Sequence, residues 1–304
     1  MSKVIRIGTR DSELALWQAN TVQQKLTDLG YQSELIPVKS TGDLILDKPL
    51  YELGITGVFT KTLDIAMING QVDIAVHSMK DVPTLLPKGI VEAAVLERAV
   101  TQDILVHKNY SPNQEPATIA TGSLRRQAQW LHKFPSHKVV DLRGNVNTRM
   151  QKLKDSDWQG AIFAAAGLKR IGLTPEETID LSWMIPAPAQ GAMLVVAMDH
   201  DEYCKEALSN LNHTNSQKCV HIERDFLRKL EGRCTAPIGA LAQIKNDILH
   251  FKGALFSLDG TQKIEIEKEI PLAESKNIGI TFAEELLANG GTELMQQIKK
   301  EMKK

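Results

Sequence analysis

The sequence predicts an α/β protein with two doubly wound lobes, followed by a small α+β domain that has an antiparallel sheet and helices. The first half of the chain alternates runs of period-two hydrophobicity with stretches of helical periodicity, as βα units with largely parallel sheets do. From about Gln217 the order changes, because several strands are grouped before a final helix. The 304 residues, 42% of them hydrophobic, are sufficient for two or three domain cores.

The first lobe is expected to begin with a buried strand and an amphipathic helix. The apolar stripe of this helix is Leu14, Ala15, Val22, Leu26 and Leu29. The expected elements are a strand at 4–8, a helix capped by Asp11 or Ser12 and ended by Gly30, a strand at 34–38, a helix at 59–69 and a strand at 72–77. The loop at 40–58 is long for a compact domain, and such loops are usually functional or mobile.

The second lobe is expected to repeat this pattern. Its predicted elements are strands at 104–107 and 118–121, a helix at 123–134, a strand at 138–142, a helix at 146–154 and a strand at 161–165. A further strand at 193–198 follows the Pro- and Ala-rich segment 185–192 and is expected to cross back to the first lobe. The predicted domains are therefore 1–97 with 193–215, then 98–192, and finally 216–304.

The third domain is expected to begin with a charged helix that ends near Leu230. Its strands are predicted at 239–243, 248–256 and 264–270. Thr281 and Glu284 have the spacing of a capping box, so the closing helix is predicted to begin at Thr281.

Composition argues against several classes of function. The net charge of −1 provides no basic field for nucleic acid, and no apolar run approaches the ~20 residues that cross a bilayer. The N-terminal residues lack the apolar core of a secretory signal, so a cytoplasmic protein is expected. Cys204, Cys219 and Cys234 form no CxxC pair, which favours reduced thiols. The eight histidines show no ligand spacing, and no metal is expected.

Arginines are concentrated in one part of this lysine-rich chain. Five of the eleven are Arg125, Arg126, Arg143, Arg149 and Arg170. Arginine holds a carboxylate or phosphate through two parallel hydrogen bonds, whereas lysine is sufficient for surface charge. Each one alone is more simply read as a solvated helix residue. Together, at the mouths of βα units, they indicate a site for a ligand with several anionic groups.

Other polar residues follow the predicted strands, where ligands bind in open α/β sheets. They are Thr9, Arg10, His77, Ser78, Lys80, Asp81, Thr121 and Ser123. Thr121 and Ser123 open a helix whose first N–H groups favour an anion. Asp81 is a lone carboxylate among cations. It is either an ion-pair partner of Lys80 or a group that moves protons and stabilises a transient cation.

Cys234 lies in the segment EGRCTAPIG, between Gly232 and Pro237, and is therefore expected on a loop. It is either a small buried hydrophobic residue or a thiol for covalent attachment, whose thiolate Arg233 would favour. The spacing leaves both open. Cys204 and Cys219 lie on helical patterns and are interpreted as packing residues.

These motifs resemble the porphobilinogen deaminase (hydroxymethylbilane synthase) family. The resemblance rests on IGTRDSELALWQA, VDIAVHSMKDVP, GSLRRQAQ, LRGNVNTR, AAAGLKRIGL, QGAM, EGxC and PIGA, which occur in the family's order. It implies three domains, of which the first two are similar to two-lobed anion-binding proteins. It also implies a dipyrromethane cofactor, built from two porphobilinogen units and joined by a thioether to Cys234.

The resemblance further implies a role for each matching residue. The residues expected to hold the cofactor are Ser78, Lys80, Asp103, Thr121, Ser123, Arg125, Arg126 and Gln190. Those expected to bind substrate and growing-chain carboxylates are Arg10, Ser12, Phe59, Arg143, Arg149 and Arg170. Asp81 matches the catalytic carboxylate. Four porphobilinogen molecules would be joined with loss of ammonia, and water would release hydroxymethylbilane from what is expected to be a monomer.

The chain departs from the family pattern at several places. Gly122 stands where serine is usual, Arg233 stands where glycine is usual, and segments 51–59, 97–103 and 186–192 differ as well. Segment 51–59 lacks a Gly-Gly-Lys that is usual in relatives. These differences concern a lid and the loop of the cofactor, whereas no core charged group is missing. The alternative function is a non-catalytic two-lobed binding protein for a carboxylated ligand. It would leave Asp81 and the EGRC segment without a task.

Overall fold

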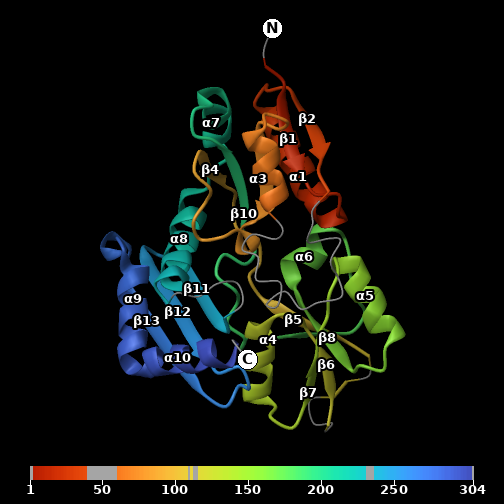
Figure 1. Cartoon of the computed structure of the whole chain (residues 1–304), viewed down its shortest axis with the longest axis vertical. Helices are drawn as coiled ribbons and strands as arrows, with labels where there is room; N and C mark the ends of the chain where they lie inside the picture. Colours follow the sequence, from red (N-terminus) through yellow and green to blue (C-terminus); the bar gives the residue numbers. More distant parts are fainter. Residues whose placement is uncertain (1–2, 40–59, 109, 112–115, 231–235, 303–304) are drawn as a thin grey trace.

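The computed structural model describes residues 3–39, 60–108, 110–111, 116–230 and 236–302. Three sheets form three bodies, with the first lobe above the second and the third domain beside both (Figure 1). The predicted 40–58 loop, Phe59, Arg233 and Cys234 lie outside the described residues.

The first lobe contains a five-stranded sheet with the order β2-β1-β3-β10-β4. Its elements are β1 (Ile5–Thr9), α1 (Glu13–Asp28), β2 (Ser33–Pro37), α3 (Lys61–Ile68), β3 (Ile74–Ser78), the 3-10 turn η2 (Met79–Asp81), β4 (Ile90–Val95), β10 (Met193–Met198) and α7 (Glu202–Ser209). Strand β10 pairs antiparallel with β3 and β4, so the chain does return to this sheet. The expectation of a largely parallel sheet is confirmed, because β1, β2, β3 and β4 run in the same direction and only the returning strand β10 runs against them. Strand β4 was not predicted, because its residues do not alternate clearly.

Helix α1 differs in detail from the predicted stripe. Val22 and Leu26 are buried as expected, but Leu29 is 45% exposed at the C-cap. Gln18 and Ala19 are buried instead. The buried amide of Gln18 is satisfied because its Nε2 donates to Ser78 Oγ at 2.9 Å. The polar residue in this helix therefore marks the side that faces the end of β3.

The second lobe repeats the arrangement with the strand order β7-β6-β8-β5-β9. Its elements are β5 (Asp103–His107), β6 (Thr118–Ala120), α4 (Leu124–Lys133), β7 (Lys138–Val140), α5 (Val146–Asp155), β8 (Gly160–Ala164), α6 (Ala165–Arg170) and β9 (Thr178–Asp180). Strand β6 is parallel to β7 and β8, whereas β5 is antiparallel to β8 and β9. Helix α6 and strand β9 were not predicted. They are short, with six and three residues, so they carry little periodicity.

The third domain is an antiparallel sheet of three strands packed against helices. Its elements are α8 (Thr214–Lys229), β11 (Ile238–Lys245), β12 (Ile248–Phe256), β13 (Lys263–Pro271), η3 (Leu272–Glu274), α9 (Ile278–Leu286), η4 (Leu287–Gly291) and α10 (Thr292–Glu301). The core includes Phe226, Phe251 and Phe282. The predicted capping box was wrong, because Asn277, with a φ of 58°, starts α9 before Thr281. The last helix is also divided, since Gly290 has a φ of 100°.

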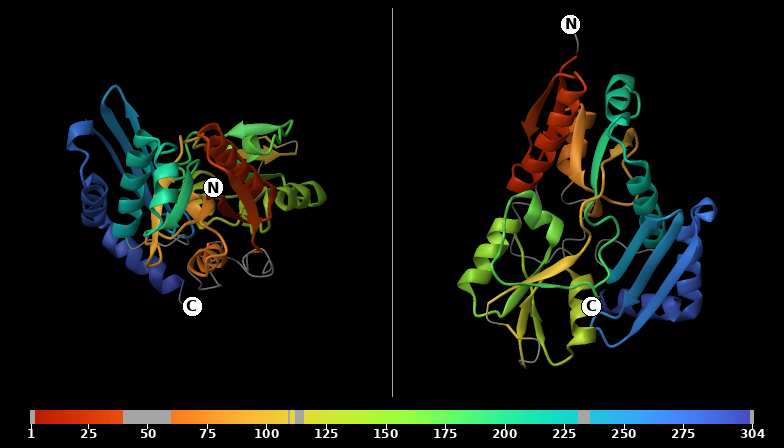
Figure 2. Two further views of the ribbon diagram at one scale, coloured as in Figure 1. Left: turned by 90° about the horizontal axis from the view of Figure 1, so that it is seen from above. Right: turned by 180° about the vertical axis from the view of Figure 1, so that it is seen from behind.

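Two segments of chain, 96–102 and 181–192, cross between the lobes (Figure 2). They contact each other: Ala99 N donates to Gly191 O at 3.2 Å. A Cβ on Gly191 would meet the carbonyl oxygens of Ala99 and Val100 at 2.8 Å, and its φ is 86°, so only glycine fits here. The boundaries proposed for the domains remain a prediction.

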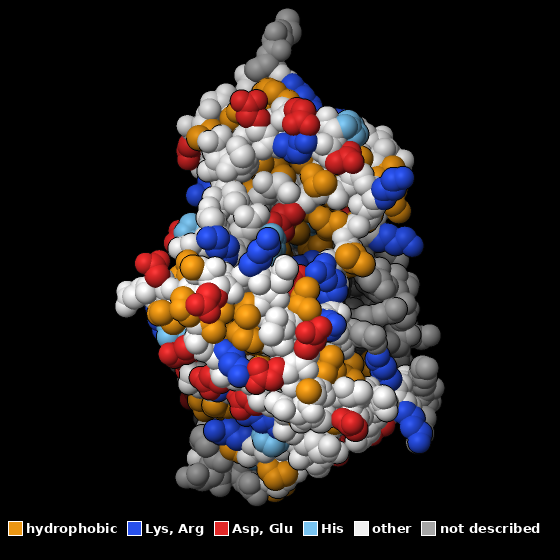
Figure 3. All heavy atoms as spheres, turned by 90° about the vertical axis from the view of Figure 1, so that its left-hand side faces the viewer, with side chains coloured by type: hydrophobic (Ala, Val, Ile, Leu, Met, Phe, Trp, Pro, Cys, Tyr) orange, Lys and Arg blue, Asp and Glu red, His pale blue; other side chains and the backbone are white. Residues whose placement is uncertain are grey.

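The third domain packs against both lobes. Val220 of α8 belongs to a core cluster of the first lobe, together with Met79 and Val82. On the other side, Ala254 and Phe256 of β12 pack with Ala128 of the second lobe. On the outer face that includes this domain, basic and acidic side chains are interspersed (Figure 3). No single-sign field covers that face, in keeping with a net charge of −1.

Candidate anion-binding and catalytic site

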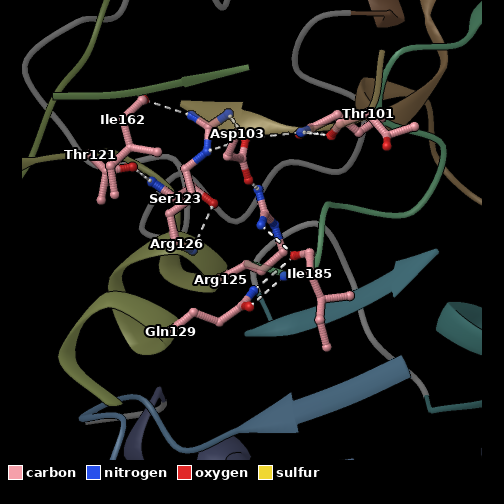
Figure 4. A network of polar contacts seen from close by, with 10 residues as sticks. Thr101, Asp103, Thr121, Ser123, Arg125, Arg126, Gln129, Ile162 and Ile185 are labelled. Carbon is pink, nitrogen blue, oxygen red and sulfur yellow. Dashed lines mark hydrogen bonds and ion pairs between the residues drawn. The ribbon is translucent and has the colours of Figure 1, made fainter. Parts of the chain in front are cut away.

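Asp103, the first residue of β5, is the centre of a buried polar network (Figure 4). Its carboxylate is fully buried and accepts from Arg125 Nη2 at 2.7 Å, Arg126 Nη2 at 2.8 Å and Gln190 Nε2 at 2.9 Å. Burial by itself raises the pKa of Asp103, but the two guanidinium groups outweigh it and hold the pKa well below the ordinary value. Asp103 is therefore an ionised anchor for two arginines.

Both anchored arginines also donate to main-chain carbonyls. Arg125 Nη1 donates to Ile185 O at 2.7 Å, and Arg126 Nη1 donates to Ile162 O at 2.9 Å. Helix α4 presents them side by side at its first turn. Arg125 Nε is buried and has no hydrogen-bond partner among the described residues. The pair is thus rigidly held, with donor capacity left for an anionic group.

The hydroxyls of Thr121 and Ser123 lie at the start of α4. Ser123 is the N-cap, and its Oγ accepts from Arg126 N at 3.5 Å. Ser123 N in turn donates to Thr121 Oγ1 at 3.3 Å. Thr121 follows β6 directly, so the sequence prediction that these residues open a helix at a strand end is confirmed.

Lys80 and Asp81 lie on the short turn that follows β3 in the first lobe. Met79 is buried beneath this turn, and its N–H donates to Ala192 O at 3.0 Å. Burial lowers the pKa of Lys80 to about 8; Asp81 opposes this, while Arg126 and Arg125 add to it. Lys80 therefore lies in the same electrostatic field as the anchored arginines of the second lobe.

Arg143 and Arg149 are placed by the turn before α5. Arg149 Nε donates to Gly144 O at 2.7 Å, and burial lowers the pKa of Arg149 to about 10, with Arg126 adding to the shift and Asp81 opposing it. Burial also lowers the pKa of Arg143, against the nearby charge of Asp141. Asp81 from one lobe and Arg149 from the other are thus electrostatic neighbours.

Arg170 lies where the lobes meet. Its Nη2 donates to Gly191 O at 2.7 Å, and its guanidinium lies 5.7 Å from the ring centroid of Trp17 on α1. Burial lowers the pKa of Arg170 to about 10. On the first lobe, burial and the charge of Arg10 lower the pKa of the His77 imidazole to about 4. His77 is therefore a neutral neighbour of Arg10.

The described residues also form an open hollow of about 390 Å³ elsewhere, lined by Lys3, Asp73 and Asp201 among others. Its charges are compensated: Lys3 Nζ lies 2.7 Å from Asp201 Oδ2, and Arg6 Nη2 lies 2.9 Å from Asp73 Oδ1. A group of buried cations, Arg125, Arg126 and Arg143, lies instead between the lobes together with half-buried Lys80, Arg149 and Arg170. That junction is the candidate site.

Sequence reasoning missed the polar residues that support this site from behind. Glu223 on α8 is fully buried and accepts from Arg98 Nη1 at 2.6 Å, Ala189 N at 2.7 Å and Ala242 N at 2.7 Å. Arg98 Nε also donates to Gln190 O at 2.8 Å, next to the Asp103 anchor. Arg98 and Glu223 are 125 positions apart, so no local pattern links them.

Comparison with known proteins agrees with the motifs. The model of the porphobilinogen deaminase dipyromethane cofactor binding domain matches residues 5–206, and that of the porphobilinogen deaminase C-terminal domain matches 217–288. The porphobilinogen deaminase of Carboxydothermus hydrogenoformans is 40% identical over 308 residues and that of Chlorobium phaeobacteroides is 41% identical over 314, each alignment covering 99% of both chains.

Among solved structures, a periplasmic substrate-binding protein of an ABC transporter from Coxiella burnetii is 16% identical, with a TM-score of 0.44, and the match covers 68% of this chain and 92% of that one. The methionine binding protein MetQ is 15% identical, with a TM-score of 0.44 and coverage of 68% and 89%. The family models and the near-complete alignments at about 40% identity establish the relationship: this chain belongs to the porphobilinogen deaminase family.

Proposed function

We propose that the junction of the two lobes joins four porphobilinogen molecules head to tail on a dipyrromethane attached to Cys234, with Asp81 as the catalytic carboxylate. Family membership makes the chain an enzyme of tetrapyrrole biosynthesis, a transferase that acts in porphyrin and heme synthesis. The alternative of a non-catalytic binding protein is set aside on the same ground. The observation that carries the assignment of residues is that two half-buried cations with lowered pKa values, Lys80 and Arg149, lie within electrostatic reach of Asp81.

The residues at the junction fit a dipyrromethane, whose two rings each carry an acetate and a propionate. Burial depresses the pKa of Lys80 and Arg149, which means that the folded chain holds these charges without full compensation. Carboxylates placed beside them would supply that compensation. Lys80, Arg125 and Arg126, with the hydroxyls of Ser78, Thr121 and Ser123, are the residues that would hold the group. Its free α-carbon supplies the acceptor for the first pyrrole.

The remaining cations suit the substrate and the growing chain. Arg10, Arg143, Arg149 and Arg170 come from both lobes, and each added pyrrole brings two further carboxylates that need partners. We assign them, with Ser12 and Phe59, to substrate binding. Asp103 and Gln190 act on the cofactor indirectly, because Gln190 and both arginines of α4 are already bonded to the Asp103 carboxylate.

We assign the catalytic role to the carboxylate of Asp81. The C–N bond of the protonated aminomethyl group breaks, ammonia leaves with the bonding electrons, and the methylene carbon stays on the substrate pyrrole, which takes up the positive charge. The carboxylate of Asp81 stabilises that charge, and it accepts or relays the proton lost from the α-carbon that forms the new C–C bond. The surrounding cations would instead repel the developing charge. After four additions, water releases hydroxymethylbilane.

The test compares Asp81→Asn and Asp81→Glu with the parent enzyme. Asparagine keeps the shape but removes the charge, so kcat should fall by about 10²–10⁴, whereas glutamate should retain more activity. Intact mass must show the dipyrromethane on each protein, and its loss in Cys234→Ser locates the attachment. Full turnover by Asp81→Asn with intact cofactor would reduce Asp81 to a structural partner of Lys80.

We further propose that the enzyme acts as a monomer in the cytoplasm. In the part of the chain that the structure describes, no helix is both long and apolar enough to span a bilayer. Light scattering during gel filtration would test the oligomeric state, since a mass near 33.7 kDa is expected.

A further inference from the structure

Arg224, on α8 of the third domain, donates hydrogen bonds to the turn that carries Lys80 and Asp81. Its Nη1 donates to Met79 O at 3.2 Å and to Val82 O at 3.0 Å, and its Nη2 donates to Pro83 O at 2.6 Å. These acceptors are main-chain carbonyls on both sides of Lys80 and Asp81. Arg224 therefore fixes the path of the backbone at this turn through main-chain contacts alone.

The apolar packing beneath the turn comes from the same helix. Val220, one helical turn before Arg224, is fully buried in one cluster with Met79 and Val82. Met79 N donates in addition to Ala192 O of the crossing segment. The turn is thus held by a hydrophobic contact, by a hydrogen bond to the crossing segment and by three hydrogen bonds from the Arg224 guanidinium.

We propose that Arg224 is a positioning residue that holds Asp81 in register with the third domain. This inference rests on the catalytic role proposed for Asp81. Helix α8 ends at Lys229, and Cys234 follows Arg224 by ten positions in the sequence. One helix therefore carries Arg224 and leads into the segment with the attachment cysteine. Helix α8 packs into the core of the third domain through Phe226, so Arg224 holds the turn of Asp81 in a fixed position relative to that domain.

The position of a catalytic group matters because a displacement of about 1 Å can cost a hundredfold in rate. Arginine suits these three carbonyls because its planar guanidinium holds its donors in a fixed fork, whereas the donors of a lysine ammonium rotate on a flexible stem. Arg224→Gln and Arg224→Lys should both preserve cofactor attachment. We expect kcat to fall by about ten- to a hundredfold for glutamine and less for lysine, with KM within about threefold of the parent.

Arg228→Gln is the matched control. Arg228 lies one turn further along the same helix, its side chain is 46% exposed, and it pairs with Asp225 on its own helix. The substitution removes the same charge from α8 without touching the turn, so kcat should stay within about twofold of the parent. Equal losses of kcat in Arg224→Gln and Arg228→Gln would overturn the inference.

The decisive measurement is a double-mutant cycle on holoenzyme, with Arg224→Gln introduced into parent and Asp81→Asn backgrounds. If Arg224 acts through Asp81, its replacement should change the low rate of Asp81→Asn by less than about threefold. Equal factors in both backgrounds would mean a general structural role and would reject the proposal. If Asp81→Asn itself is fully active, the catalytic assignment fails first. Should Arg224→Gln fold poorly, Arg224→Lys takes its place in the cycle, with the same two outcomes.

Discussion

The Asp103 carboxylate accepts hydrogen bonds from three side chains, and these bonds determine its role. A carboxylate among cations would repel the carboxylates of a ligand if it faced them. Because Arg125 and Arg126 surround it, its charge instead fixes the direction of the two guanidinium groups. Its pKa is lowered by them, so this contribution to stability is present above the ordinary carboxyl pKa and is lost as the pH falls towards the folded value.

Lys80 gives a second pH-dependent prediction, in a higher pH range, because folding disfavours its charged form, whereas folding favours the charged form of Asp103. The folded pKa of Lys80, about 8, lies below the ordinary lysine value, so between the two the unfolded chain binds more protons than the folded chain. The free energy of unfolding of the cofactor-free protein should therefore rise by about 1–2 kcal/mol from pH 8 to pH 10. Urea unfolding of the parent and of Lys80→Met would measure it. A rise of the same size in Lys80→Met would assign the effect to another group.

At the level of elements, the start of α4 lies unusually close to the segment after β7. A Cβ on Gly122 would meet Leu142 O at 2.6 Å and Asp141 Oδ1 at 3.1 Å. The absence of a side chain therefore lets the N-terminus of α4, which carries Ser123, Arg125 and Arg126, approach the turn that carries Arg143. The glycine that departs from the family pattern has a packing reason in this chain.

Gly122→Ala should consequently lower the free energy of unfolding by about 1–3 kcal/mol, because the added methyl group must displace backbone. Gly167→Ala is the control, since Gly167 lies in α6 and its nearest side-chain atom, Leu14 Cδ2, would be 3.8 Å from the new Cβ. There, alanine should be neutral or stabilising by up to about 1 kcal/mol. Chemical denaturation of both variants would measure these free energies of unfolding. An unchanged free energy of unfolding in Gly122→Ala would show that the two segments can separate freely.

Helices and strands were predictable from the sequence where the hydrophobic periodicity was strong. They were less predictable where long-range contacts determine where an element starts or in which direction it runs. The helices α4 and α5 and all three strands of the third domain lie close to their predicted positions. The capping box at Thr281 failed because Asn277 begins the helix from a left-handed conformation, which local spacing does not reveal. The direction of β10 and β5 within their sheets depends on crossing segments, and no short pattern encodes that direction.

The candidate site shows the same division. Strand-end residues such as Lys80 and Arg126 were identified from the sequence because their motifs follow apolar runs. Arg98, Glu223 and Arg224 were assigned no role, because their partners are supplied by distant segments. The supporting residues of a site are therefore harder to predict than those that face the ligand.

At the scale of the whole molecule, Glu223 joins the third domain to both crossing segments. It bonds with Arg98, Ala189 and Ala242, so its replacement should loosen all three domains together. Glu223→Gln leaves Arg98 buried without its counter-charge and should cost about 3–5 kcal/mol. Calorimetry of this variant should show thermal unfolding at a lower temperature and over a broader temperature range. Glu284→Gln, which breaks an exposed pair with Lys229, should cost at most about 1 kcal/mol, and equal costs would contradict the prediction.

The place of β10 in the first sheet has a consequence for synthesis on the ribosome. This strand lies between β3 and β4, so among the described residues β4 pairs only with β10 and gains this neighbour once residue 198 has emerged. All strands of the second lobe lie between β4 and β10 in the sequence and are complete before then. Synthesis from the N-terminus therefore allows the second lobe to fold first, whereas the sheet of the first lobe can be completed only after β10 has been synthesised.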